Sequence, residues 1–168
     1  MEIINAKIQQ TQFVVLSSTI KTTMVRSGDS VKINDVPIDI DYEILTNKKL
    51  GPHVVRVVMT IKGNNTESIR GYVFELRVGA EYRLSKDIDP ASSEYFGLIH
   101  YSAVPCVINE SRAFLQAQTA FFPFNSYIMP MISVEDLVKS KNASQKTNSA
   151  QDDKKRKNPI AKKGISEV

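Results

Sequence analysis

The stretch from Asp89 to Phe124 constrains the fold more than any other part of the chain. Asp89 is suited to cap a helix, Pro90 is suited to its first position, and the apolar residues that follow recur near helical spacing. We therefore predict one long helix over this stretch. Pro105 lacks a backbone N–H and its ring crowds the preceding turn, so the helix is expected to kink or break near Val104.

The predicted helix carries more apolar surface than a single sheet can cover. Its apolar side chains spread around more than one stripe, as shown by Phe96, Leu98, Ile99, Tyr101, Val104 and Val107. A surface helix needs one stripe to pack on its own domain, so a second apolar face is expected to meet a neighbouring subunit or a ligand. We assign Leu98, Tyr101 and Val107 to a subunit interface.

The clearest strand pattern runs from Val36 to Thr46. Apolar residues alternate there with Asp39, Asp41 and Glu43, which predicts one buried face and one wet, acidic face. The three carboxylates stand in line along the strand and do not converge as metal ligands would. They are either a solvated strand face or a docking surface for a basic partner.

Three further strands are predicted from alternating or apolar runs bounded by turn residues. They are Ile8–Thr19 with Phe13, Val15 and Ser17 on one face, Val54–Lys62, and Ile69–Val78 followed by a bulge at Gly79-Ala80. A long connection is expected from Ile20 to Asp35, which is rich in turn formers. Short turns join the last three strands, so we predict an antiparallel meander.

The chain after the long helix changes character twice. A loop from Asn125 to Met131 leads to Ser133-Val134-Glu135-Asp136, which resembles a capping box with Asp in place of the usual Glu or Gln and predicts a short helix through Val138. From Lys139 onward the residues are almost all polar, and such a segment is expected to be disordered. We therefore divide the chain into a domain over residues 1–138 and a tail over residues 139–168.

The positive net charge belongs to the tail. Residues Lys139–Val168 hold nine Lys and Arg against three Asp and Glu, whereas Met1–Val138 holds thirteen against fifteen. The run Asp152–Lys157 and the basic residues up to Lys163 fit either a solubilising tail or a contact with nucleic acid or an acidic partner. No aromatic residue interleaves with these charges, so base stacking is not supported.

Cysteine usage and hydropathy indicate the compartment. Cys106 is the single cysteine, which excludes an internal disulfide and fits a reducing environment. The N-terminal residues lack the pattern of a signal peptide, and no stretch approaches the roughly 20 apolar residues of a membrane span. These features predict a soluble, cytoplasmic protein.

No motif for catalysis, metal binding or cofactor binding stands out. His100 and Cys106 are six positions apart on the predicted helix, which places them about 120° apart around its axis. His53 lies near a strand entrance, and no second Cys is present to complete a metal site. There is no Gly-rich phosphate loop, so we expect neither an enzyme nor a bound cofactor.

Large apolar side chains concentrate around the end of the long helix. The cluster consists of Phe114, Phe121, Phe122, Phe124, Tyr127 and Met129. It is either ordinary core or an apolar groove for a flexible client, because Met and aromatic side chains are large and adaptable. In the second interpretation these six residues bind the client.

The order of elements from Ile8 to Leu137 resembles the SecB family of protein-export chaperones. That order is a strand, a long connection, a three-strand meander, a long Pro-interrupted helix, a Pro-rich loop and a short helix. The best local matches are the segment from Tyr72 through Leu84, then Arg112, Phe122-Pro123, Pro130 and Asp136-Leu137. The order and spacing of these residues carry the resemblance, which excludes the tail.

The resemblance implies an α+β fold in which a four-stranded antiparallel sheet has a long kinked helix and a short helix on one face. It also implies a homotetramer built as a dimer of dimers, with helices packed between the dimers. Its function would be ATP-independent holding of unfolded polypeptides, in protein export or for a dedicated client such as an antitoxin. The export chaperone docks the motor SecA through its sheet, and Val73 and Glu75 match that position.

Four departures from the family pattern favour a dedicated client as much as an export role. Glu110-Ser111 replace the Pro-Tyr that precedes the helix Arg, and Ala120-Phe121 stand where a glycine usually precedes Phe-Pro. The first strand has no acidic residue to complete a SecA site, and the tail is basic instead of acidic. A dimer is the alternative assembly if the missing Pro-Tyr weakens the second interface.

Overall fold

The computed structural model describes residues 6–23, 36–47, 49–64 and 71–143 of the 168-residue chain. It divides into two compact units, Met1–Val134 and Glu135–Val168. The first unit contains a sheet and the helical stretch that follows it, and the site described below lies within this unit. The expected long connection falls largely on residues 24–35, and the basic run from Asp152 to Lys163 falls on the tail; both lie outside the described residues.

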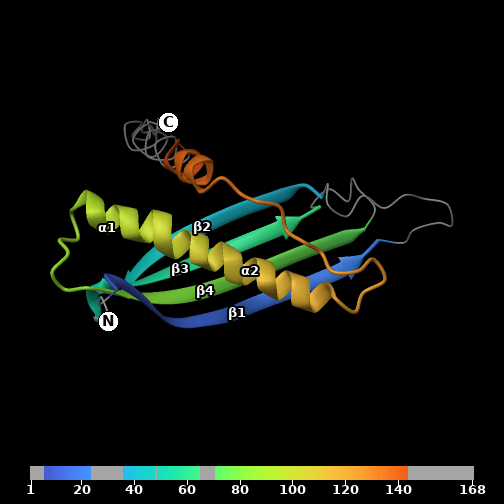
Figure 1. Cartoon of the computed structure of the whole chain (residues 1–168), viewed down its shortest axis with the longest axis horizontal. Helices are drawn as coiled ribbons and strands as arrows, with labels where there is room; N and C mark the ends of the chain where they lie inside the picture. The colour runs from blue at the N-terminus through green and yellow to red at the C-terminus, as the bar shows by residue number, and fades with distance from the viewer. Residues whose placement is uncertain (1–5, 24–35, 48, 65–70, 144–168) are drawn as a thin grey trace, which may run out of the picture. The chain divides into compact units, whose positions relative to one another are not determined.

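Four antiparallel strands form the sheet of the first unit (Figure 1). The strands are β1 (Ile8–Thr22), β2 (Ile38–Asn47), β3 (Gly51–Gly63) and β4 (Tyr72–Leu84), and their order across the sheet is β1-β4-β3-β2. The predicted meander of β2, β3 and β4 is confirmed. β1 pairs with the far side of β4, so β1 and β2 are the two edges.

The alternation predicted for the three strands of the meander is confirmed. In β2, Tyr42 is buried while Asp39, Asp41 and Glu43 are exposed. In β3 and β4 the buried side chains on the helix-covered face are Val55, Val57, Met59, Ile61, Tyr72, Phe74, Leu76, Val78, Tyr82 and Leu84. Burial of these large side chains on one face supplies most of the driving force for the fold.

The predicted bulge at Gly79-Ala80 is wrong. β4 keeps an unbroken register through these residues with both β1 and β3, and the two irregularities lie in β1, between Gln10 and Gln12 and between Val15 and Ser17. The second one shifts the side-chain alternation by one residue. Phe13 and Val15 therefore face the helix as predicted, whereas Ser17 pairs with Arg77 on the opposite face.

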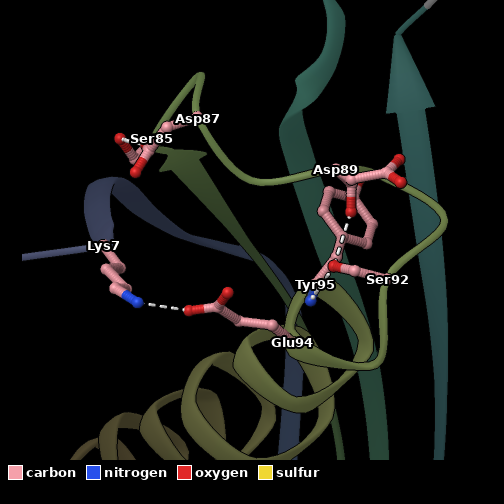
Figure 2. Close-up of polar contacts among 7 residues, drawn as sticks. All are labelled: Lys7, Ser85, Asp87, Asp89, Ser92, Glu94 and Tyr95. Carbon is pink, nitrogen blue, oxygen red and sulfur yellow. Dashed lines mark hydrogen bonds and ion pairs between the residues drawn. The ribbon is translucent and has the colours of Figure 1, made fainter.

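The helical stretch begins three residues later than predicted. Asp89 closes a turn in which the Ser92 backbone and side chain both donate to its carbonyl oxygen, and Ser92 itself caps α1 (Ser93–Leu98) by accepting from the Tyr95 backbone (Figure 2). Pro90 is accommodated within that turn. Lys7, just before β1, pairs with Glu94 in the first turn of α1 and ties the helix start to the sheet.

The interruption predicted near Val104 is confirmed, and it takes the form of a π-helical turn. This segment, η2 (Ile99–Ala103), joins α1 to α2 (Val104–Thr119), and the Val104 backbone N–H reaches back to Ile99. In a regular α-helix the ring of Pro105 would crowd the carbonyl four residues earlier. A widened turn before Pro105 relieves that clash without ending the helix.

Polar contacts and packing fasten the helical stretch to one face of the sheet (Figure 1). The Tyr82 hydroxyl donates to the Ala103 carbonyl at 3.1 Å, and Gln10 Nε2 donates to Glu110 Oε1 at 2.6 Å. Val104, Val107 and Ile108 turn their apolar side chains into the core.

The predicted C-terminal ends of the long helix and of the short helix both need correction. α2 ends at Thr119 and not at Phe124, because residues 120–124 form turns. Asn125, which follows them, adopts a positive φ of 64°. The predicted short helix is present over residues 134–143, five residues longer than expected at its C-terminal end, and it lies almost wholly in the second unit. Residues 139–143 of the expected disordered tail are thus helical.

Candidate functional site

The candidate site is the apolar segment, residues 120–131, which follows α2. Phe121 is 98% exposed and Met131 is 88% exposed, and Ile128 and Phe122 also present apolar surface to solvent. Such large apolar side chains gain free energy when they are covered, at roughly 25 cal/mol for each Å² removed from water. Their clustering within one short segment gives a surface that favours an apolar partner.

Side chains from neighbouring elements hold the backbone of the apolar segment. The Tyr72 hydroxyl donates to the Asn125 carbonyl at 2.6 Å, and the Tyr127 backbone N–H donates to Thr119 Oγ1 at 2.7 Å. Thr119 in turn donates to the Leu115 carbonyl in α2. The segment lacks regular secondary structure, so these side chains satisfy backbone groups that no ladder or helix would reach.

Arg112 of α2 makes the most extensive of these contacts. Its Nε donates to the Met129 carbonyl at 3.0 Å and one terminal nitrogen donates to the Pro130 carbonyl at 2.9 Å. The other terminal nitrogen donates to Asn109 Oδ1 at 2.9 Å. The guanidinium fork thus fixes two consecutive carbonyls of the apolar segment against the helix.

An aromatic cluster lies beneath the exposed side chains. The Tyr72 ring meets Phe122, Phe124 and Tyr127 in edge-to-face contacts with centroids 5.7 to 6.1 Å apart, and Phe74 lies 5.0 Å from Tyr127. Contacts of this geometry stabilise the packing beyond the buried area alone. The cluster joins the apolar segment to the core side of β4.

The Tyr127 side chain is fully buried at the base of this cluster. Its hydroxyl finds no hydrogen-bond partner within the described part of the chain, and burial raises the pKa of Tyr127 to about 12. Burial also raises the pKa of Tyr72 above its usual value, an effect that its contact with the backbone near Phe124 partly offsets. Both phenols therefore remain neutral at physiological pH.

The six residues predicted to bind a client divide into three groups. Phe121 and Phe122 are exposed, Phe114 and Phe124 are half-buried, and Tyr127 and Met129 are buried. The last two support the surface from below and have no area free to touch a partner. The sequence interpretation missed Ile128 and Met131, although the alternation from Tyr127 onward gave the signal that Ile128 would face outward.

The residues predicted to dock a partner share the outer face of the sheet, opposite the helix. They are Val73 and Glu75 on β4 and Asp39, Asp41 and Glu43 on β2. The two groups are not adjacent, because β3 runs between them. Lys62 of β3 is the cross-strand neighbour of both Asp39 and Glu75, and its Nζ lies 3.4 Å from a Glu75 carboxylate oxygen.

The residues predicted for a subunit interface also differ in exposure. Tyr101 is 52% exposed, Leu98 is half-buried against the core cluster of Val55, Leu84 and Ile99, and Val107 is fully buried. Val107 packs against its own sheet and has no surface left for a neighbour, so the interface role assigned to it is wrong. Phe96, beside Tyr101 with ring centroids 6.4 Å apart, adds the exposed apolar area that the sequence interpretation did not assign.

His100 lies in η2 beside this surface and contacts the sheet. Its Nδ1 is 2.9 Å from the Tyr42 hydroxyl of β2, and its ring centroid is 4.0 Å from that of Phe96. Burial lowers the pKa of His100 below its ordinary value. Among the described residues, no group of three or more His, Cys, Asp and Glu is placed to hold a metal ion.

This fold, an open four-stranded antiparallel sheet with a long interrupted helix on one face, is that of SecB-like chaperones. The Mycobacterium tuberculosis SecB-like chaperone Rv1957, solved in complex with a ChAD peptide from the Rv1956 HigA1 antitoxin, superposes with a TM-score of 0.51 at 12% identity, over 76% of this chain and 91% of that one. The predicted α+β, SecB-like fold is confirmed.

A second solved structure also resembles the chain, though less closely. It is a protein of unknown function from Streptococcus agalactiae, with a TM-score of 0.44 and 7% identity, over 74% of this chain and 97% of that one. No model of a known protein family matches the sequence, and no curated protein matches it. Within the described ranges, no helix is long and apolar enough to cross a membrane.

Proposed function

We propose that the protein is an ATP-independent chaperone that holds non-native polypeptides on the apolar segment. The observation that carries this proposal is the exposure of Phe121, Ile128 and Met131 on a backbone that hydrogen bonds already hold in place. A surface that served only the chain's own core would turn these side chains inward. Holding requires neither a cofactor nor bond chemistry, so we assign no catalytic activity.

The client is a flexible chain with apolar side chains, and a dedicated client fits best. Rv1957, which shares the fold, was solved with a peptide from an antitoxin. An export role with SecA would use the outer face of the sheet, where Lys62 separates Glu75 from the acidic row of β2. A basic side chain within an acidic docking surface weakens attraction for a basic partner. We therefore favour an antitoxin-like client in the cytoplasm over an export substrate.

The test is suppression of aggregation. Chemically denatured citrate synthase is diluted into buffer with increasing amounts of the protein, and light scattering is followed. We expect suppression near stoichiometric amounts and a loss of it in the Phe121→Ser, Met131→Ser double variant. Each of the two side chains, if fully covered by a client, contributes roughly 1.5–3 kcal/mol to binding, so their joint removal weakens binding by at least about tenfold.

Leu50→Ser is the matched control. Leu50 is exposed in the turn between β2 and β3, outside the apolar segment. Leu50→Ser makes the same kind of apolar-to-polar change outside the apolar segment and should leave suppression unchanged. A wild-type protein that fails to suppress aggregation at stoichiometric excess argues against general holding. The proposal of a dedicated, antitoxin-like client is then tested by direct binding of the HigA1 ChAD peptide, used as a probe.

We also propose that the protein assembles as a homotetramer. Two separate surfaces leave apolar area uncovered, one around Phe96 and Tyr101 and one on the edge strand β1, where Leu16 is exposed. Each surface can close on its own copy through a two-fold axis, and two such contacts on one chain produce a dimer of dimers. With only one of the contacts, the assembly is a dimer.

An alternative function is suggested by the charge of the tail. Lys139–Val168 holds nine basic and three acidic residues, which suits nucleic acid or an acidic partner. This adaptor role predicts RNA binding that weakens steeply with salt and vanishes on truncation after Ala143, where the described helix ends. Client holding should survive the same truncation, so one truncated protein separates the two functions.

A further inference from the structure

Arg112 stands out because it faces the backbone, and not the side chains, of the candidate site. Three of its nitrogen atoms donate hydrogen bonds, two of them to the Met129 and Pro130 carbonyls and one to Asn109. Bonds from a charged donor are roughly twice as strong as neutral ones. Two consecutive carbonyls of the apolar segment therefore receive charge-assisted hydrogen bonds.

The two carbonyls belong to a part of the apolar segment that contains both buried and exposed side chains. Tyr127 and Met129 are buried, whereas Ile128 and Met131 face solvent. Fixing the carbonyls of residues 129 and 130 fixes the direction in which the flanking side chains point. The guanidinium fork is therefore placed to hold the backbone on which Met129 is buried and Ile128 and Met131 are exposed.

These contacts are well suited to order the segment and poorly suited to hold the core together. Arg112 is half-buried; its bonds to Asn109 and Pro130 are exposed to solvent, and its bond to Met129 is partly buried. Water can replace exposed hydrogen bonds at little cost in folding free energy. Water cannot, however, hold the segment in one conformation as a planar, multidentate guanidinium does.

We propose that Arg112 is a positioning residue that preorganises the apolar segment for its client; the proposal rests on the function proposed above. A client that meets a preordered surface does not have to spend binding free energy on ordering it. Arg112 touches no client in this scheme. It acts through Ile128 and Met131, which make the contact.

Arg112→Met tests the proposal because it keeps an unbranched side chain that reaches as far as the Nε position and removes every donor. We expect binding of reduced, carboxymethylated α-lactalbumin, a permanently unfolded probe, to weaken about tenfold, since the ordering cost returns to the binding step. Arg112→Lys, which retains one ammonium donor, should recover part of this loss. Arg77→Met, on the outer face of β4, is the control and should bind as the wild type does.

Methionine methyl groups provide a readout that is independent of client binding. Met129 and Met131 report on the apolar segment, and the fully buried Met59 of β3 reports on the core. In Arg112→Met, the NMR signals of Met129 and Met131 should shift and sharpen toward those of mobile methyl groups, while the signal of Met59 stays unchanged. Loss of the Met59 signal would make Arg112 a structural residue and overturn the proposal.

The two readouts also separate this proposal from the proposed function. If the wild type binds no unfolded probe, general holding fails, and the Met129 and Met131 signals still decide whether Arg112 orders the segment. If the wild type binds but Arg112→Met binds equally well, the positioning role fails and the chaperone function stands. Unchanged Met129 and Met131 signals in the variant overturn the positioning role in either case.

Discussion

His100 is the residue whose environment makes a pH effect predictable. It contacts Tyr42 from β2 and Phe96 from α1, and burial lowers its pKa in the folded chain. When Nδ1 carries no proton, the Tyr42 hydroxyl can donate to it. Protonation places a hydrogen on both ring nitrogens, so this donation is lost.

The sign of the effect follows from linkage. The unfolded chain, with an ordinary His pKa near 6.5, binds the proton more readily than the folded chain does. The contribution of neutral His100 to the free energy of unfolding is therefore fully present above about pH 6.5. It is lost as the pH falls from there through the lower pKa of the folded chain. We expect the urea midpoint to fall between pH 7.5 and pH 5.5, and to fall less in His100→Gln. Equal decreases in the two proteins would assign the effect to other groups.

Tyr127 and Tyr72 form a matched pair for testing buried hydroxyls. The Tyr72 hydroxyl donates to the Asn125 carbonyl, whereas the Tyr127 hydroxyl is buried without a partner among the described residues. Tyr72→Phe should destabilise the fold by about 1 kcal/mol, because it leaves a carbonyl unpaired. Tyr127→Phe should be neutral or stabilising by up to about 1 kcal/mol. Thermal unfolding followed by circular dichroism measures both, and a larger loss in Tyr127→Phe would contradict the assignment.

At the level of elements, two glycines predict opposite effects of the same substitution. A Cβ at Gly63, at the end of β3, would overlap the ring of the buried Phe74. Gly97 lies in α1 with open space around it. Gly63→Ala should cost roughly 1–3 kcal/mol through overpacking, and Gly97→Ala should stabilise by roughly 0.5–1 kcal/mol through helix propensity. Denaturant titrations of both variants are the measurement; a stable Gly63→Ala would show that the Phe74 ring can move aside.

The strands were predictable from sequence where one face is buried and the other is wet. The alternation of apolar and acidic residues over Val36–Thr46 identified β2 and its acidic face, because a repeat of two residues is typical of a half-buried strand. β1 was harder, since none of its residues is fully buried and two irregularities shift its phase. A local pattern cannot reveal such a shift, which depends on the register with β4.

The ends of the long helix depended on tertiary contacts that spacing alone does not contain. Asp89 and Ser92 are both suited to cap a helix. Because the chain makes a turn around Pro90, Ser92 is the residue that caps α1. Phe121–Phe124 continue the apolar pattern of the helix. The chain nevertheless leaves the helix, and the Tyr127 backbone N–H donates to the Thr119 hydroxyl. The break at Pro105 was predictable because the missing N–H is a local property; its π-helical form was not.

The candidate site was predictable as a cluster, though not side chain by side chain. Sequence placed large apolar residues after the helix, and the structure turns Phe121 outward and Tyr127 inward. The direction of each side chain depends on Tyr72, Thr119 and Arg112, which lie 8 to 53 positions away from the backbone groups they bind. The same distance in sequence explains why the contacts of Arg112 with the apolar segment could not be predicted from the sequence.

At the scale of the whole molecule, the surfaces left open in one chain are the strongest argument for assembly. β1 is an edge strand of 15 residues without a buried side chain, and an unpaired edge of that length invites pairing with another chain. Phe96 and Tyr101 expose a second apolar area on the helix-covered side. Closed symmetry covers both areas without leaving free ends that would continue into fibres.

The final prediction is that Tyr101→Asp dissociates a tetramer without unfolding the chain. Tyr101 is half exposed in the single chain, so a carboxylate there remains solvated in the monomer and becomes buried without a partner only in the assembly. Val107→Asp, by contrast, places the charge in the core and should prevent folding.

Light scattering coupled to size exclusion should give four chains for the wild type, and two or one for Tyr101→Asp with an unchanged circular dichroism spectrum. Leu50→Asp places the same charge on an exposed residue of the β2–β3 turn; it is the control and should keep the wild-type mass. A wild type that is a folded monomer at micromolar concentration would refute the assembly and leave the apolar surfaces to the client alone.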